Sequence, residues 1–218
     1  MVKIDFKQVV GQAIPQNILR KILENEKLAS SYLFYGPEGL GKWVAALELA
    51  KALNCESQNT KPCQTCSSCV KISKLSHPDI ILVFPTPSTS KEEEFFKYYE
   101  RFKQEKIKEP YALVEFEKNA LISKERMNDL KREIFRRPYE TKKKVVIINQ
   151  AEKMMTNSFN SFLKVLEEPP AYAILILTTS QPERLLPTVI SRCQKIRFGQ
   201  LKPELIQAEL VKRLNLDS

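Results

Sequence analysis

The sequence has little of several residue types, and each shortage narrows the chemistry open to it. Its single histidine, His77, means that any histidine-based metal site or nucleophile would depend on that residue alone, and the following Pro78 and Asp79 favour a turn instead. No apolar run approaches the roughly 20 residues that a helix needs to cross a membrane. The first residues also lack a signal-peptide core, so we expect a cytoplasmic protein without membrane contact.

Glycine is scarce as well, with five residues, yet three of them fall in one heptapeptide. Gly36, Gly39 and Gly41 precede Lys42 and fit the phosphate-loop pattern G-x-x-x-x-G-K. In such a loop, backbone N–H groups and the positive end of the following helix bind phosphates, and the lysine reaches their outer oxygens. The next position, which normally supplies a hydroxyl for Mg²⁺, is Trp43. The pattern predicts a phosphate cradle without metal-assisted hydrolysis, or a tight turn with no ligand.

The flanking sequence gives the loop the context that it needs. Residues 31–35 predict a short buried strand, and residues 44–54 have the apolar spacing of a helix. A preceding amphipathic helix is predicted over residues 14–28, with Ile14, Ile18, Ile22 and Leu23 on its apolar stripe.

A second departure from phosphate-loop ATPases follows the strand predicted at residues 145–148. Such enzymes end this strand with an acid that supports Mg²⁺, often followed by a glutamate that activates water. Here Asn149 and Gln150 occupy these positions, and amides lack the charge and the basicity. Glu152 lies two residues farther on and would need a different strand ending to substitute. Thr178 or Thr179, at the end of the strand predicted at residues 173–179, is a candidate sensor of a γ-phosphate.

Four of the five cysteines fall within fifteen residues, as Cys55, Cys63, Cys66 and Cys69. Their spacing can close a tetrahedral shell of four thiolates, which predicts a structural Zn²⁺; an iron–sulfur cluster would use the same ligands. The fifth, Cys193, is predicted to be a buried apolar residue.

The net charge of +9 favours an acidic or polyanionic partner. One run of basic residues lies at the end of a helix predicted from Ser123 to Arg137 and in the turn after it. These residues would contact a nucleic-acid backbone or form a solvated face. The run comprises Lys131, Arg132, Arg136, Arg137, Lys142, Lys143 and Lys144.

Residues 86–110 are polar and charged, and they predict a loop followed by an exposed helix inserted into the fold. The aromatic residues of this insertion would stack on bases or pack the helix onto its own domain. They are Phe95, Phe96, Tyr98, Tyr99 and Phe102. Farther along, a second strand at residues 80–84, a helix at 158–168 and an edge strand at 195–198 complete an α/β pattern.

Taken in order, these motifs closely resemble the delta-prime branch of the bacterial DNA polymerase III clamp-loader family. The resemblance covers nearly the whole chain except the insertion at residues 86–110. Besides the cysteine insert, it is carried by Gly36–Lys42, Lys164–Pro170, Pro182–Leu186 and Ser191–Cys193. The related gamma/tau ATPase subunits keep a threonine after the lysine and the acidic pair after the strand, so Trp43, Asn149 and Gln150 favour delta-prime.

The resemblance implies an AAA+ fold, with a five-stranded parallel sheet flanked by helices, over residues 1–200. Within it lie the cysteine module at 55–69 and the insertion at about 86–110, and residues 201–218 would begin a helical lid of a longer subunit. It also implies that Arg192 acts in trans as an arginine finger on ATP held by a neighbouring gamma/tau subunit. The implied partners are gamma/tau, delta, the sliding clamp and primed DNA.

Two other functions stay open on the sequence. The chain could be a gamma/tau-like ATPase that uses Glu152 and water-mediated Mg²⁺. Alternatively, it could be a zinc-dependent module that binds nucleic acid. Whether the altered loop retains ATP or ADP is also left open by the residues alone.

Overall fold

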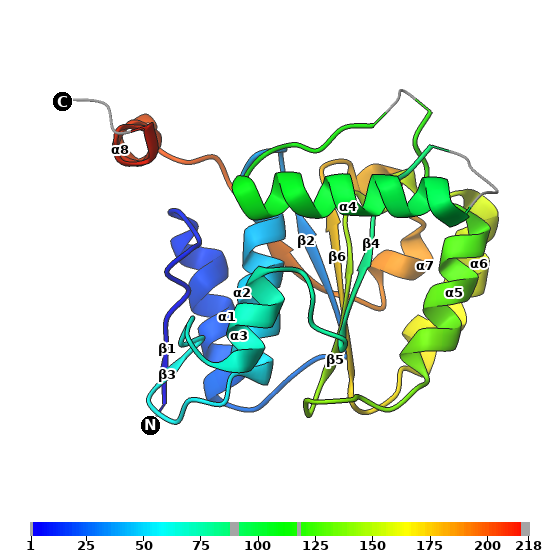
Figure 1. Ribbon diagram of the computed structural model, residues 1–218, viewed down its shortest axis with the longest axis horizontal. Coiled ribbons are helices and arrows are strands. Elements are labelled where there is room, and N and C mark those ends of the chain that lie inside the picture. Colours follow the sequence, from blue (N-terminus) through cyan, green and yellow to red (C-terminus); the bar gives the residue numbers. More distant parts are fainter. Residues whose placement is uncertain (1, 88–91, 117–118, 215–218) are drawn as a thin grey trace.

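One parallel sheet organises the protein, as seen in a computed structural model that describes residues 2–87, 92–116 and 119–214 (Figure 1). Its strands are β2 (Ser31–Tyr35), β4 (Ile80–Val83), β5 (Lys144–Ile148), β6 (Ala173–Thr179) and β7 (Gln194–Arg197). They lie in the order β4-β5-β6-β2-β7, and every neighbouring pair is parallel. The predicted five-stranded α/β fold is therefore confirmed, with β7 at an edge.

Helices cover both faces of this sheet because successive strand side chains point to opposite sides. Tyr32 and Phe34 join one core, and Leu33 between them joins the other. The first core contains residues of α1 (Ala13–Glu24), α2 (Lys42–Asn54) and α3 (Ser67–Ser73). The second contains residues of α5 (Lys124–Ile134), α6 (Thr156–Glu167) and α7 (Pro187–Ile190).

Several predicted boundaries need correction. The first helix ends at Glu24 and not at Leu28, and Ile14 is 73% exposed, so it does not belong to the buried stripe. The helix after the glycine loop begins at Lys42, two residues early, and α5 ends at Ile134, three residues before Arg137. Smaller shifts affect β4, β7 and α6, each by one or two residues.

Short elements complete the fold. The strands β1 (Lys3–Ile4) and β3 (Thr60–Lys61) pair in parallel and tie the start of the chain to the cysteine segment. The 3-10 helices η1 (Ala151–Lys153) and η2 (Pro182–Arg184) follow β5 and β6. The last helix, α8 (Pro203–Leu214), lies at one side of the molecule in Figure 1, with Leu205 close to Gly11. In the part of the chain that the structure describes, no helix has the length and hydrophobicity needed to span a bilayer.

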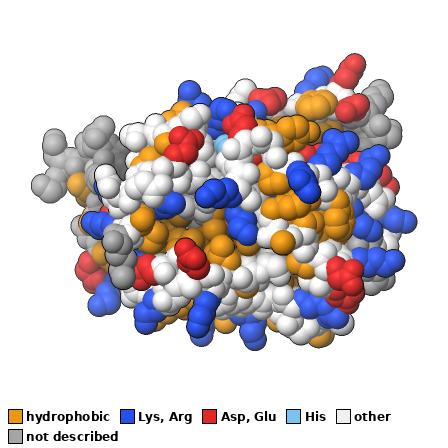
Figure 2. Space-filling view, turned by 90° about the horizontal axis from the view of Figure 1, so that it is seen from below, with side chains coloured by type: hydrophobic (Ala, Val, Ile, Leu, Met, Phe, Trp, Pro, Cys, Tyr) orange, Lys and Arg blue, Asp and Glu red, His pale blue; other side chains and the backbone are white. Residues whose placement is uncertain are grey.

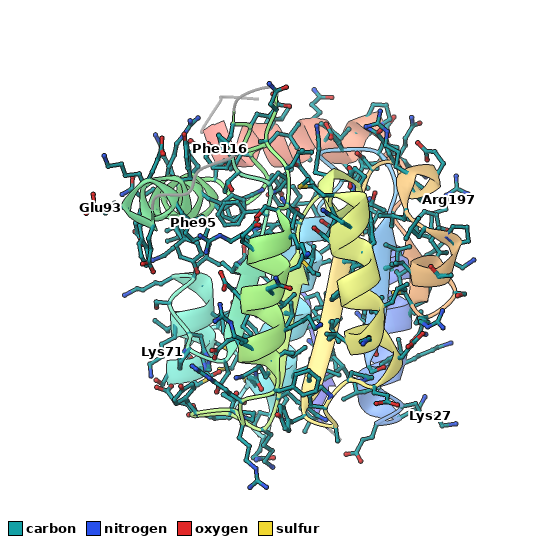
Figure 3. The ribbon with its side chains drawn as sticks, turned by 90° about the vertical axis from the view of Figure 1, so that its right-hand side faces the viewer. Lys27, Lys71, Glu93, Phe95, Phe116 and Arg197 are labelled. Atoms are coloured by element: carbon teal, nitrogen blue, oxygen red, sulfur yellow. The ribbon has the colours of Figure 1, made fainter. Side chains whose placement is uncertain are left out.

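The insertion folds as α4 (Glu92–Lys108), which lies across the top of the sheet in Figure 1. The beginning of the predicted loop, at residues 88–91, lies outside the described residues. Figure 3 shows Phe95 and Phe116 on the side of α4 that faces the sheet, and Glu93 on the opposite side. Phe102 is 1% exposed. The prediction of an exposed helix is therefore wrong for one face of α4. The aromatic residues on this face pack the helix onto its own domain, which was the alternative to base stacking.

The predicted basic run also needs a correction. Lys144 is fully buried in β5, where its Nζ donates hydrogen bonds to the Glu133 backbone oxygen (2.9 Å) and to Glu133 Oε1 (3.4 Å). It is therefore part of the core and not of a basic surface. Figure 2 views the face opposite α4, where apolar side chains gather in patches among lysines and arginines.

Candidate functional site

The glycine loop joins β2 to α2, and its backbone geometry depends on glycine. At Gly36 the φ angle is 141°, and a Cβ there would overlap the backbone oxygen of Phe198. At Gly41 the φ angle is 82°, in the left-handed region that side chains other than glycine rarely adopt. Gly39, with φ 74°, shares this region. The loop thus has the tight strand-to-helix turn of a phosphate cradle.

Lys42 turns back onto the loop itself. Its Nζ donates hydrogen bonds to the backbone oxygens of Gly36 (2.6 Å) and Pro37 (2.5 Å). Burial lowers the pKa of Lys42, whereas the charges of Glu152 and Glu38 act in the opposite direction. The ammonium group is therefore satisfied by carbonyl groups that a bound phosphate would have to replace.

Trp43 fills the position where a hydroxyl group would hold Mg²⁺. It is 5% exposed, and its ring meets Phe102 of α4 edge to face, with centroids 5.2 Å apart and an interplanar angle of 88°. Its Nε1 is buried and has no hydrogen-bond partner in the described chain. Trp43 therefore serves as a packing residue between α2 and the insertion.

Asn149 and Thr178 bond to each other across the ends of β5 and β6. The Thr178 hydroxyl donates to Asn149 Oδ1 (2.9 Å) and accepts from the Gln150 backbone N–H (3.3 Å). Thr178 is 2% exposed. The candidate sensor hydroxyl and the amide in the position of the metal-supporting acid are thus already paired, and neither contributes a charge.

Glu152 lies closer to the cradle than the sequence suggested. Gln150 adopts a left-handed conformation (φ 54°), and η1 starts directly after it, which turns Glu152 into the site. Its Oε1 accepts hydrogen bonds from the Ser180 backbone N–H (3.2 Å) and hydroxyl (2.8 Å). Its Oε2 is buried without a hydrogen-bond partner among the described residues. The strand β5 ends at Ile148 as predicted, so the turn at Gln150, and not a different strand ending, brings Glu152 to the cavity.

These side chains line one small cavity of about 60 Å³. Ligand pockets in proteins usually measure about 300–1,000 Å³, so this cavity is well below that range. Five residues of the insertion and the segment after it also line the cavity, among them Lys106, Tyr111 and Val114. The full lining consists of residues 38–44, Lys106, Pro110, Tyr111, Leu113, Val114, Asn149, Gln150, Glu152 and residues 178–180.

The four predicted metal ligands come together at the end of α2 and the start of α3. The sulfur atoms of Cys55, Cys63, Cys66 and Cys69 all lie within 4.8 Å of one another. A tetrahedral Zn²⁺ with Zn–S bonds of about 2.3 Å would place its sulfur ligands roughly 3.8 Å apart. The cluster therefore fits a structural Zn²⁺ with no open coordination position.

Backbone N–H groups inside this module point at the sulfur atoms. The N–H of Cys63 donates to Cys55 Sγ (3.3 Å), that of Cys66 to Cys63 Sγ (3.2 Å), and that of Cys69 to Cys66 Sγ (3.5 Å). Burial opposes ionisation of Cys63, but hydrogen bonds, first from the Thr65 backbone, lower its pKa to about 6. Donors of this kind stabilise thiolates, which are the form that binds metal.

A buried network joins this module to the helix that follows the glycine loop. Lys51 and Glu48, both on α2, form an ion pair (2.9 Å) with side chains 7% and 1% exposed. Gln64, between two of the cysteines, donates to both Glu48 oxygens and accepts from Lys51 (3.0 Å). The cysteine module thus braces α2, whose first turn is the cradle.

Arg192 lies outside the cavity, on the surface after α7. Its Nη2 contacts Glu167 Oε1 (2.7 Å), and its Nη1 donates to the backbone oxygen of Thr188 (2.9 Å). Its side chain is 36% exposed. The structure therefore separates the candidate arginine finger from this chain's own cradle.

The remaining candidates have structural roles. His77 is buried in a turn, where its Nδ1 accepts the Asp79 N–H (3.1 Å), and burial lowers its pKa. Cys193 is 8% exposed, and burial raises its pKa to about 12. Both environments agree with the sequence-based interpretation of a turn residue and a buried apolar residue.

The chain is similar in sequence to subunits of DNA polymerase III. A family model described as "DNA polymerase III, delta subunit" matches residues 11–202. The delta-prime subunit of DNA polymerase III from Bacillus subtilis is 34% identical over 196 residues, which is 90% of this chain and 50% of that protein. The tau subunit from the same organism is 30% identical and covers 95% of this chain but 31% of its own length. The chain thus spans about half the length of one relative and about a third of the other.

Solved structures agree on the fold. A DNA polymerase III gamma subunit-related protein of Thermotoga maritima superposes with a TM-score of 0.50 at 18% identity, over 89% of this chain and 49% of that one. The Holliday junction branch migration motor RuvB of the same organism gives a TM-score of 0.56 at 14% identity, over 95% and 51%. At these identities the likeness concerns the AAA+ architecture alone.

Proposed function

This chain belongs to the DNA polymerase III, delta subunit family of clamp-loader proteins, and we propose that it acts there as a delta-prime subunit that does not hydrolyse ATP. In this proposal it completes the ATP site of a neighbouring gamma/tau subunit and helps to place the sliding clamp on primed DNA. Its direct partners would be gamma/tau and delta, in the cytoplasm.

The observation that carries the proposal is the composition of the cradle at the three positions where ATP hydrolysis needs oxygen ligands or a base. Trp43 has no hydroxyl and is buried against Phe102. Asn149 accepts a hydrogen bond from the Thr178 hydroxyl and, as an amide, carries no negative charge to support a metal ion. Gln150 cannot take a proton from water. A subunit with this cradle contributes to an ATP-driven assembly through its surfaces.

Arg192 is the surface residue suited to that contribution. A guanidinium group inserted beside a γ-phosphate offsets charge in the transition state and can increase the rate by roughly 10³ to 10⁵. Its present partners, a carboxylate and a carbonyl oxygen at an exposed site, are ones that a phosphate can replace. The arginine needs no functioning nucleotide site on its own subunit.

The cysteine module would hold one structural Zn²⁺ through Cys55, Cys63, Cys66 and Cys69. When bound, the ion would fix the loop between α2 and α3 and, through Gln64 and Glu48, the helix that carries the cradle. We assign it no part in catalysis, because four thiolates leave no open position.

The test uses a reconstituted clamp loader in which the gamma/tau subunit next to this chain is the only one with an intact phosphate-loop lysine. We expect Arg192→Ala and Arg192→Lys to lower DNA-stimulated ATP hydrolysis at that site at least tenfold, since lysine lacks the bidentate fork. Arg184→Ala, at another exposed arginine nearby in sequence, is the matched control. Hydrolysis unaffected by Arg192→Ala would sink the proposal.

The geometry of Glu152 favours one alternative, an ATP-hydrolysing subunit of the gamma/tau type. Its buried carboxylate lines the same cavity as Lys42 and has one oxygen without a described hydrogen-bond partner. Steady hydrolysis by the purified protein, abolished by both Lys42→Ala and Glu152→Gln but not by Glu183→Gln at an exposed site, would support this alternative.

A further inference from the structure

The two unusual features of the sequence, Trp43 and the insertion, lie in contact with each other. Phe102 of α4 meets the Trp43 ring edge to face and stacks on Phe84 with centroids 3.9 Å apart and planes 6° apart. Lys106, one helical turn farther on, places its Nζ 5.3 Å from the centre of the Trp43 ring. The indole that occupies the metal-ligand position is therefore the surface on which the insertion packs.

The chain after α4 folds back over the cradle. Lys106 Nζ donates to the Ala112 backbone oxygen (2.6 Å), and the Ala112 N–H donates to the Glu109 backbone oxygen (3.0 Å). The Tyr111 N–H donates to Glu109 Oε1 (3.1 Å). These bonds fix a turn, and Val114, 6% exposed, anchors its far end in the core.

Tyr111 lies beside the end of the glycine loop. A Cβ at Gly41 would come within 3.0 Å of the Tyr111 ring, so the ring lies directly against the start of α2. The Tyr111 hydroxyl accepts a hydrogen bond from the Val10 N–H (2.7 Å) and lies 3.0 Å from the Gln8 backbone oxygen, to which it donates. Tyr111 thereby links the segment before α1 to the end of α2 where a phosphate group would bind.

We propose that residues 102–114 form a cap segment that keeps nucleotide out of this chain's own cradle, so that ATP or ADP enters only when the cap segment moves away. The cap segment lines the same small cavity as Lys42, whose ammonium group bonds to the Gly36 and Pro37 carbonyl oxygens. The proposal goes beyond the function given above and does not depend on Arg192 or on any partner subunit.

The expected size of the effect follows from population arithmetic. Apparent affinity falls in proportion to the fraction of molecules whose site is open, so a cap segment that is open about 1% of the time weakens binding about 100-fold. A variant in which the cap segment is held less tightly has its site open more often, and it should recover part of this 100-fold loss of affinity. Since the cradle lacks a metal hydroxyl ligand, the recovered binding should be similar with Mg²⁺ and with EDTA.

The experiment titrates the purified protein with ATP, in Mg²⁺ and in EDTA, and follows the fluorescence of Trp43, the single tryptophan. For the native sequence we expect half-saturation above about 1 mM, which corresponds to a binding free energy of roughly 4 kcal/mol. We expect Tyr111→Ala, and Lys106→Met through loss of the bond to Ala112, to tighten binding at least about tenfold. Tyr139→Ala and Lys97→Met, at exposed positions, are the matched controls and should bind like the native protein.

A second measurement needs no variant. Amide hydrogen exchange of the native protein at about 10 mM ATP should increase at residues 109–114, because bound nucleotide displaces them. The proposal is overturned if folded Tyr111→Ala and Lys106→Met proteins bind ATP no more tightly than the native protein. It is equally overturned if the native protein binds ATP in the micromolar range with unchanged exchange at residues 109–114.

Discussion

The Arg192 guanidinium rests against the carboxylate of Glu167, with 2.7 Å between Nη2 and Oε1. Both side chains are partly exposed, 36% and 46%, and solvent screening limits such a pair to about 0–1 kcal/mol. The pair can therefore keep the arginine in place without competing strongly with a phosphate group. Glu167 belongs to the segment Lys164–Pro170 and Arg192 to Ser191–Cys193, two of the motifs that carry the family resemblance.

Glu167→Gln should separate the contribution of this ion pair to stability from the contribution of the Arg192 guanidinium group to ATP hydrolysis. We expect it to change the free energy of unfolding by less than about 1 kcal/mol, measured by urea denaturation. In the reconstituted loader it should leave ATP hydrolysis unchanged or faster, because the arginine is held less tightly away from phosphate. A loss of hydrolysis as large as that of Arg192→Ala would mean that the ion pair itself, and not the guanidinium group, supports the reaction.

Metal analysis of the purified protein should find about one Zn²⁺ per chain, bound by the four-cysteine shell. Cys66→Ser should lose most of it, whereas Cys193→Ala, outside the module, should retain it. Because the module braces α2, metal loss should lower the melting temperature by about 5 °C or more, which corresponds to roughly 2 kcal/mol for a chain of this size. A protein that stays metal-free under reducing conditions and melts at the same temperature as its Cys66→Ser variant would refute the zinc assignment.

Asp79 should control acid stability. It is fully buried and accepts hydrogen bonds from the backbone N–H groups of Tyr139, Glu140 and Thr141 (2.6, 2.9 and 3.0 Å). Burial alone would raise its pKa, but these bonds, with one from the Thr141 hydroxyl, lower the pKa of Asp79 below its ordinary value. Its contribution is therefore complete above about pH 4, the unfolded pKa, and is lost as the pH falls through the lower folded pKa.

Asp79→Asn removes this charge while keeping the shape. We expect it to lower the free energy of unfolding at pH 7 by roughly 2–3 kcal/mol, because hydrogen bonds to a charged acceptor are lost. Below about pH 4 the difference from the native protein should shrink. Urea titrations between pH 3 and pH 7 measure this, with Asp129→Asn, whose side chain is 44% exposed, as the control. A difference that does not depend on pH would show that packing, and not charge, is responsible.

The sequence predicted the sheet well because its strands are continuous apolar runs buried on both faces, such as residues 145–148 and 173–179. The cysteine cluster and the glycine loop could also be predicted from the sequence, since the spacing of their residues specifies the geometry. Contacts between segments far apart in the chain could not be predicted in this way. The place of Glu152 depends on a left-handed Gln150, and the pairing of β1 with β3 involves only two residues from each strand.

The cap segment shows the same limit most clearly. The sequence alone does not distinguish the five aromatic residues of the insertion from one another. In the structure, however, Phe102 is 1% exposed and Phe96 is 54% exposed. Which ring becomes core depends on the surface offered by Trp43 and Phe84, far away in the chain. One feature of the sequence could have predicted this contact. The chain has both an added helix and a tryptophan at the metal-ligand position, and a large apolar side chain there needs a packing partner.

Trp43→Thr tests whether the altered cradle can be repaired at one position. The substitution restores the missing hydroxyl, but it also empties the space under Phe102, and replacing a buried aromatic ring by a small side chain typically costs about 3–5 kcal/mol. We therefore expect a clear loss of stability in urea denaturation. We also expect no Mg²⁺-dependent ATP hydrolysis, because Asn149 and Gln150 still lack the charge and the basicity that the reaction requires. Hydrolysis by the Trp43→Thr protein would instead show that Glu152, already buried beside Lys42 in the cavity, is a sufficient acid, and that the indole alone prevents hydrolysis by this chain.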